Sequence, residues 1–276
     1  MATKIPSFTY SGDYRTEIIG ENWYIFFLTS GTLRMNYGKT ADLYLHGGGG
    51  GGSNTGYNDA GGSGGGDGWF SNHYGIHVDA GVSYEIVVGE GGAGGSPGHV
   101  DGYKGEASSA FGYSVEGGNG GTYMSVGGTG YSGSGGNVWG SVGSGNTTYA
   151  FDSAAGLIYG GCGGGGGQAG GKPYGAGGNN TLNAAANTGA GGGGRSHHDS
   201  ETGAPGGKGG SGIVILRSDQ DDQLPVKFGS ATLTKMVFDG SEVKHLVYNG
   251  TRLFMERVRR CADWSKPKTR FVLQEA

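Results

Sequence analysis

The sequence predicts an all-β protein, in which a β-sheet domain carries a glycine-rich bundle of polyglycine II helices and is followed by a small antiparallel β-meander. Glycine supplies 68 of 276 residues, whereas average proteins contain roughly 7% glycine. Short apolar segments bracket the glycine blocks, and the composition changes after residue 218. These observations divide the chain into a glycine-rich domain over residues 1–218, a linker over 219–223 and a β-hairpin repeat module over 224–276.

Short apolar runs predict the strands of the first domain. Residues 23–28 (WYIFFL) are continuously apolar and residues 41–45 (ADLYL) alternate, with a turn at Ser30-Gly31 and a polar loop between them. Further strands are expected where apolar residues interrupt or close the glycine blocks. These runs are residues 84–88, 109–113, 155–159 and 213–216. A disordered Gly/Ser linker would not contain such segments.

Glycine blocks such as residues 47–52 have no side chains from which to build an ordinary core. Collagen is excluded, because no strict Gly-X-Y period occurs and the chain has only 6 prolines. The ordered alternative is polyglycine II, an extended helix with three residues per turn and no internal hydrogen bonds. Such helices pack closely and bond to their neighbours, with other residues projecting outward. A flexible, unfolded spacer is the disordered alternative.

The last 58 residues contain only three glycines, Gly229, Gly240 and Gly250. Strands are expected over residues 231–238, 242–248 and 251–254, separated by Asp-Gly and Asn-Gly, which are strong two-residue hairpin signals. The segments MVFDGSEV and LVYNGTRL repeat with a period of about ten residues. This indicates a small antiparallel meander, close to the lower size limit for independent folding.

The order of these pieces resembles the glycine-rich domain of bacteriophage tail proteins, including tail-fibre and tail-tip adhesins. The resemblance covers about residues 5–218. The segments that carry it are 8–14 (FTYSGDY), 23–33 (WYIFFLTSGTL), 41–50 (ADLYLHGGGG), 84–95 (YEIVVGEGGAG) and 210–217 (GSGIVILR).

The resemblance implies a virion tail protein, assembled in the bacterial cytoplasm, that recognises the host through loops between polyglycine helices. The implied partners are a host cell-surface glycan or protein, other tail or fibre proteins, and further copies of this chain. A purely structural virion protein of the baseplate, tail or capsid is the alternative. An ice-binding protein would require regular rows of small residues. The residues that interrupt the glycine blocks of this chain are instead irregularly spaced and aromatic.

Aromatic residues that interrupt glycine are the candidate receptor-binding residues, since aromatic rings stack on sugar faces and lose little side-chain entropy on binding. The alternative is that they only cap the bundle. The candidates are Trp69, Phe70, His73 and Tyr74 in a first cluster, Tyr123, Tyr131 and Trp139 in a second, and Tyr149 and Tyr174 in a third. The basic C-terminal residues Arg257, Arg259 and Arg260, with Trp264, are candidates for docking onto an acidic partner.

No catalytic constellation or cofactor motif is found, so an enzyme is not expected. The histidines His197 and His198 are adjacent to Asp199, and His73 and His77 lie elsewhere, but no metal-site spacing is met. The net charge of −4 lacks the basic excess of nucleic-acid-binding proteins. No apolar stretch reaches the length of a membrane span or signal core. Cys162 and Cys261 are expected to be free thiols.

Overall fold

The computed structural model describes residues 5–54, 62–96, 101–123, 127–130, 143, 148–152, 155–163, 165, 183–195 and 205–219. Beyond residue 225 it describes the backbone of strands β13 to β18. The chain forms two compact units, residues 1–218 and 219–276. The described secondary structure is almost entirely β, so the predicted all-β class is confirmed.

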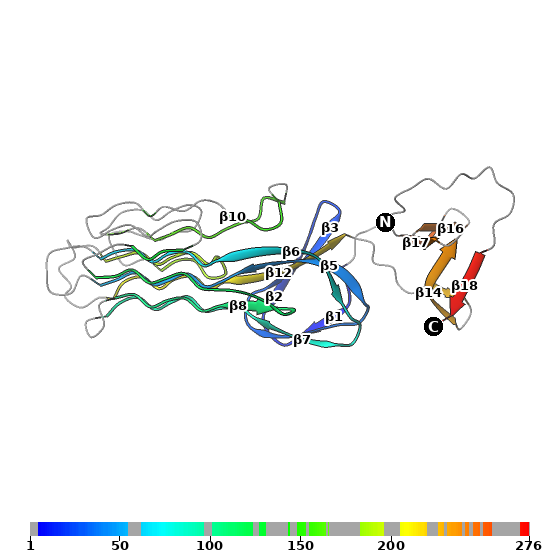
Figure 1. Ribbon diagram of the computed structural model, residues 1–276, viewed down its shortest axis with the longest axis horizontal. Coiled ribbons are helices and arrows are strands. Elements are labelled where there is room, and N and C mark those ends of the chain that lie inside the picture. The colour runs from blue at the N-terminus through cyan, green and yellow to red at the C-terminus, as the bar shows by residue number, and fades with distance from the viewer. Residues whose placement is uncertain are drawn as a thin grey trace. The chain divides into compact units, whose positions relative to one another are not determined.

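Two five-stranded antiparallel sheets form the body of the first unit (Figure 1). The first sheet, in the order β1-β4-β7-β8-β9, consists of Phe8–Tyr10, Gly31–Met35, Ser83–Val87, Ser108–Ala110 and Tyr113–Val115. The second sheet, in the order β2-β3-β12-β5-β6, consists of Tyr14–Ile19, Asn22–Phe27, Ile213–Asp219, Lys39–His46 and Phe70–Val78.

The apolar run at residues 23–28 is continuous because its strand is buried on both faces. In β3, Trp23, Ile25 and Phe27 pack between the two sheets, where they meet Leu33 and Ile86 from the first sheet. Successive side chains of a strand point to opposite faces. The intervening aromatic residues of β3 therefore face away from the first sheet.

A third layer covers that outer face of the second sheet. It contains the short hairpin of β10 (Thr148–Tyr149) and β11 (Ile158–Tyr159). Phe151, in the loop of this hairpin, packs with Tyr24 and Tyr44. Arg217 of β12 binds Asp42 and Asp152, both at 3.0 Å, and so ties the loop to the sheet.

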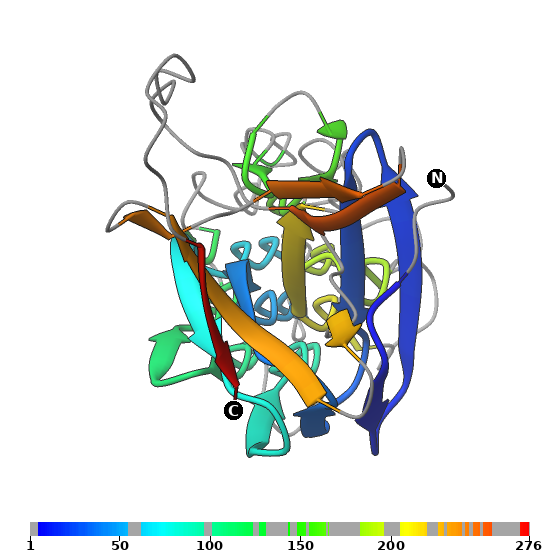
Figure 2. The ribbon, with the colours of Figure 1, turned by 90° about the vertical axis from the view of Figure 1, so that its right-hand side faces the viewer.

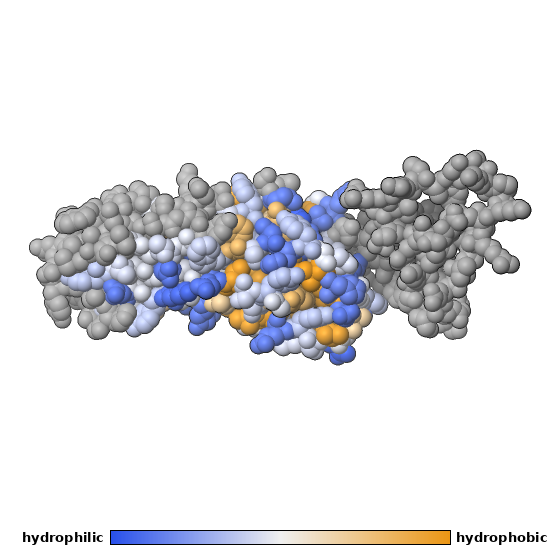
Figure 3. Space-filling model, in the orientation of Figure 1, coloured by the Kyte–Doolittle hydropathy of each residue, from blue (hydrophilic) through white to orange (hydrophobic). Residues whose placement is uncertain are grey.

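Aromatic contacts close the two open sides where the sheets meet. On one side, Tyr14 of β2 lies edge-on to Phe8 and Tyr10 of β1. On the other side, His73 of β6 stacks on Tyr113 of β9, with ring centroids 3.8 Å apart. Hydrophobic residues gather over this sheet region in Figure 3, whereas the glycine-rich part is pale or blue.

The structure corrects several expected elements. Residues 109–113 do not form one strand, because Phe111 and Gly112 both have positive φ and turn the chain from β8 to β9. The expected polar loop after Ser30 contains β4, and the expected strand at 155–159 is reduced to Ile158–Tyr159. Strands β1, β2 and β6 were not expected.

The second unit contains the two hairpins that the Asp-Gly and Asn-Gly signals predict. In one, β14 (Ala231–Phe238) pairs with β15 (Ser241–Glu242), and in the other β16 (His245–Tyr248) pairs with β17 (Thr251–Met255). Strands β13 (Val226–Phe228) and β18 (Phe271–Glu275) flank β14. The described pairings give two sheets, and the antiparallel meander expected for this unit stays a prediction.

Candidate functional site

Glycine-rich segments continue the strands away from the sheets, side by side in Figure 1 and end-on in Figure 2. Strand β5 leads into residues 47–54, and residues 62–69 lead back into β6. In the same way, strand β7 leads into residues 89–96, and residues 101–107 lead back into β8. Segments 116–123, 189–195 and 205–212 complete the group.

The hydrogen bonds of the central segment, residues 47–54, repeat every third residue. Gly47, Gly50 and Ser53 donate to the 62–69 segment at 2.8–2.9 Å. The amides in between donate to two other segments, 101–107 and 205–212. Carbonyl groups of the central segment accept bonds from three further segments, 89–96, 116–123 and 189–195. The central segment is therefore bonded to six neighbours.

The six neighbours also form a closed ring around the central segment. Every adjacent pair in this ring is joined by backbone hydrogen bonds. The bonded pairs are 62–69 with 116–123, 116–123 with 101–107, 101–107 with 89–96, 89–96 with 205–212, 205–212 with 189–195, and 189–195 with 62–69. We call this assembly the glycine bundle.

Close contact between backbones explains why the central segment is glycine. A Cβ added at any position from Gly47 to Gly52 would lie 2.0–2.2 Å from a backbone carbonyl oxygen of a neighbouring segment. These residues are buried. Burial without hydrogen bonds would make the polar backbone costly, and here the neighbouring segments supply those bonds.

On two outer segments of the bundle, residues other than glycine face outward at every third position. One row contains Pro205, Lys208 and Ser211, and a second contains Glu90, Ala93 and Ser96. Lys208 binds Glu90 across the two rows at 3.1 Å. Lys104 binds Glu116 at 2.6 Å and holds the pKa of the Glu116 carboxyl below its usual value.

Several segments of the bundle begin or end on the side away from the sheets. We call this the distal end. Ser53 bonds to Ser63 there, and Arg195 bonds to both Ser53 and Gly62. The side chain of Tyr123 is half-buried at this end, and its amide donates to Asp101 Oδ1 at 2.5 Å. The connections that begin and end here are residues 55–61, 97–100, 124–126 and 196–204.

The first predicted aromatic cluster lies on strand β6 and at the residue just before it, not in a loop between glycine segments. Trp69 precedes the strand and is 44% exposed. Phe70 packs inward against Tyr44, and His73 stacks on Tyr113 at the opposite face of the strand. The structure therefore divides this cluster between two faces.

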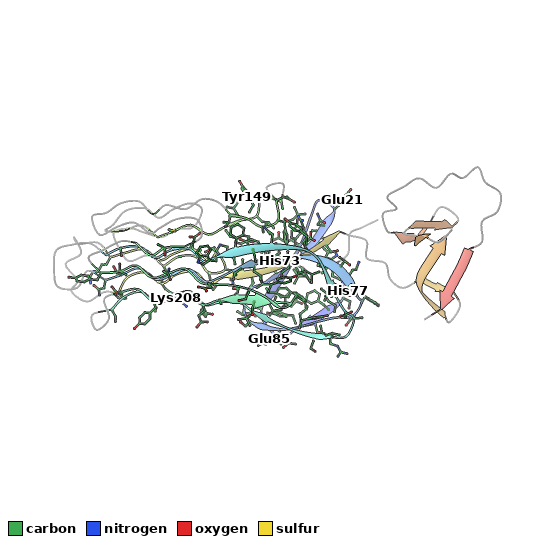
Figure 4. All side chains as sticks on the ribbon, viewed as in Figure 1. Glu21, His73, His77, Glu85, Tyr149 and Lys208 are labelled. Carbon is green, nitrogen blue, oxygen red and sulfur yellow. The ribbon has the colours of Figure 1, made fainter. Side chains whose placement is uncertain are left out.

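Tyr74 and Tyr149 are both exposed but belong to the sheet end of the unit. Tyr74 is 61% exposed, and its hydroxyl donates to Phe151 O at 3.1 Å. Tyr149 lies in β10, and Figure 4 shows it beside the sheets and on the other side of the unit from Lys208. Of the predicted candidates that the structure describes, Tyr123 alone lies at the distal end.

The remaining predicted residues lie outside the described part of the chain. They are Tyr131, Trp139, Tyr174, the docking residues Arg257, Arg259, Arg260 and Trp264, and also His197, His198, Asp199 and Cys261. Cys162 is buried and is not part of a disulfide.

Among the described residues, no three His, Cys, Asp or Glu side chains are grouped to hold a metal ion. His73 and His77 lie at different points along β6 (Figure 4) and bind Ser71 and Asp79, respectively. No helix in the described part of the chain is long and apolar enough to cross a membrane.

Two features of the site were not found by sequence reasoning. Tyr113, which is 42% exposed, adds an aromatic ring beside His73. A buried polar group, with His46, Asp67 and Thr148 as members, lies where the strands meet the glycine bundle. The sequence offered no signal for either, because the partners lie far apart along the chain.

Comparison with known proteins supports the glycine-rich assignment. No curated protein matches the chain. A family model described as a glycine-rich domain matches residues 28–219, which include the glycine bundle and most strands of the two sheets. The chain belongs to this glycine-rich domain family.

Proposed function

We propose that this chain is a receptor-binding component of a bacteriophage tail, or of a phage-derived particle, and that it contacts the host surface with its distal end. The observation that carries the proposal is that the described residues on either side of four connections, 55–61, 97–100, 124–126 and 196–204, lie together at one end of the glycine bundle. A rigid scaffold that presents several chain reversals together is a common design for binding surfaces.

We infer that the segments of the bundle are polyglycine II helices. Hydrogen bonds that repeat every third residue support three residues per turn. The backbone donors of residues 47–53 and the backbone acceptors of residues 48–53 pair with other segments, as helices without internal bonds require. Packed in this way, the helices would hold the distal end rigid and so reduce the entropy cost of binding.

The connections offer chemistry suited to a surface glycan or protein. They contain Tyr57, Asn58 and Asp59 in the first and His197, His198 and Asp199 in the last. Aromatic, amide and carboxylate groups stack on sugars and bond their hydroxyls. The chain would act without catalysis or cofactor. Several copies in one particle would add weak contacts through effective concentration.

The proposal is tested by measuring binding of the purified full chain to cells, and to purified cell-wall polysaccharide, of the strain that the encoding phage infects. We expect saturable binding below tens of micromolar. A variant with residues 196–204 replaced by a Gly/Ser segment of equal length should lose most of it. Replacement of 79–82, a turn at the sheet end of the unit, is the matched control and should leave binding unchanged.

Two outcomes would overturn the receptor role. One is absence of binding at tens of micromolar by a folded wild-type chain, and the other is equal loss in both replacements. Absence of binding together with density for the chain in a map of the particle would favour the alternative, a structural baseplate, tail or capsid protein.

A further inference from the structure

Strand β2 has one open edge in the described part of the chain. It is the first strand of the second sheet, in the order β2-β3-β12-β5-β6, and it pairs with β3 on one side only. An open strand edge presents unpaired backbone groups that can pair with a strand of another chain. The proposed receptor role concerns the distal end of the bundle and makes no use of this edge.

The hydrogen bonds to β3 show which backbone groups of β2 face the open edge. Just before the strand, Leu28 N donates to Asp13 O at 2.9 Å. Along an antiparallel strand, successive residues direct their amide and carbonyl groups alternately to one side and to the other. The odd-numbered residues of β2 therefore bond to β3, and the backbone groups of Tyr14, Thr16 and Ile18 face outward. No described residue bonds to these outward groups.

The charged side chains of β2 and its exposed apolar side chains lie on opposite faces of the strand. On one face, Arg15 forms an ion pair with Glu17, and both side chains are exposed. The Arg15 guanidinium also lies over the Phe26 ring of β3, 3.6 Å from its centroid. On the other face, Tyr14 and Ile18 are 47% and 43% exposed. Each face therefore offers a side chain at either end of the strand that can meet a complementary one.

Two copies of β2 are complementary when they pair antiparallel with Thr16 opposite Thr16. The outward backbone groups of both copies then face one another. Arg15 lies opposite Glu17 of the second copy, and Tyr14 lies opposite its Ile18. Opposite charges and apolar pairs placed directly across two strands are stabilising, whereas like charges are destabilising. A pairing centred on Arg15 or on Glu17 would place like charges opposite one another.

We propose that two copies of this chain form a two-fold dimer through β2, in which their second sheets join into one continuous sheet. Both copies use the same strand, as an isologous interface requires. About six backbone hydrogen bonds would form, because three residues in each copy present an amide and a carbonyl. Charged residues usually protect an edge from pairing, but here their opposite signs permit pairing with a second copy in one register.

The dimer is tested by sedimentation velocity of the full chain. The interface is small, so we expect dimerisation of the wild type at about 100–500 µM. Arg15→Glu and Glu17→Arg each place like charges across the interface, and each should weaken dimerisation by at least about tenfold. An equimolar mixture of these two variants restores opposite charges and should form a mixed dimer.

The matched control is Arg34→Glu, which makes the same change in charge. Arg34 is exposed on β4, which lies between β1 and β7 and has no open edge. This variant should dimerise as the wild type does. Thermal unfolding of every variant checks that it is folded.

A wild-type chain that remains monomeric at about 500 µM would overturn the proposal, and this result stands even if a variant does not fold. Dimerisation that neither Arg15→Glu nor Glu17→Arg weakens would place the contact elsewhere and also reject it. Two folded variants that fail to form a mixed dimer would reject the pairing of Arg15 with Glu17. None of these results depends on binding to host cells, so they leave the receptor role to its own test.

Discussion

The two sheets and the glycine bundle bury their interiors by opposite means. Between the sheets, large side chains such as Trp23 and Leu43 fill the core and exclude water. In the bundle, Gly47 to Gly52 are equally buried, but the atoms in contact are backbone atoms. One region is stabilised by side-chain packing, and the other by a nearly complete set of backbone hydrogen bonds between closely spaced segments.

This difference predicts opposite responses to mutation. A side chain made smaller leaves a cavity between the sheets. A side chain made larger in the central segment forces backbones apart and breaks hydrogen bonds on several sides. The size of each effect therefore measures which kind of packing stabilises each region.

The largest effect is expected for Gly51→Ala. The added methyl carbon would lie 2.0 Å from Ala93 O and 2.5 Å from Ala93 C, which are backbone atoms that cannot rotate away. We expect a loss of more than about 4 kcal/mol in the free energy of unfolding, measured by urea denaturation. Gly38→Ala is the control, because its Cβ would meet nothing closer than 3.7 Å. Similar losses in the two variants would contradict close backbone packing.

A smaller effect is expected for Leu43→Ala in β5. Leu43 is fully buried between the sheets, and truncations of this kind cost about 2–5 kcal/mol. The same urea measurement applies, with the exposed Ile18→Ala as its control. A loss no larger than that of Ile18→Ala would show that the contacts between the sheets contribute little.

A pH effect of moderate size is expected at the boundary between the two regions. Burial lowers the pKa of His46, although the bond to Gly47 and the charge of Asp67 oppose this shift. The folded state therefore favours the neutral form of His46. The contribution of His46 to the free energy of unfolding is complete above the pKa of histidine in the unfolded chain, about 6.5. This stabilising contribution is lost as the pH falls from about 6.5 toward the lower pKa that His46 has in the folded protein.

The measurement is the Tm at pH 7 and pH 5, together with an NMR titration of the His46 ring. Burial also lowers the pKa of His73, which adds an effect of the same sign, and His73→Gln separates the two contributions. Titration of the His46 ring at or above the pKa of a free histidine would reject this account.

The smallest effect is expected for Lys208→Gln on the outer rows of the bundle. The Lys208 and Glu90 side chains are 51% and 63% exposed, and solvent screens such ion pairs. We expect no measurable change in Tm by differential scanning fluorimetry. A clear fall would mean that the outer rows, and not only the glycine backbone, hold the segments together.

Local patterns in the sequence predicted the elements that depend on neighbouring residues. The apolar run of β3, the alternation of β5 and the closing strand β12 were found, and so were both hairpins of the second unit. Strand β6 was missed because its aromatic residues follow a glycine block and looked like interruptions of it. Its identity depends on pairing with β5.

The arrangement of the bundle could not be predicted in the same way. Glycine runs carry no side-chain pattern. No local feature of the sequence therefore predicts that residues 47–54 are central, or the order in which six segments surround them. The residues that face outward from the bundle are also more regularly spaced than we expected from the sequence. Their rows include the charged residues Lys208 and Glu90, unlike the rows of small residues that an ice-binding surface requires.

Hydrogen exchange at the amides of Gly48 and Gly51 tests the central claim most directly. These amides donate to Glu106 O and Tyr103 O at 3.0 and 2.9 Å. If the central segment is a packed backbone core, they should exchange as slowly as the amides of Leu43 and Leu45 in β5, and only through global unfolding. Exchange at the rate of unstructured glycine, with β5 still protected, would contradict the account.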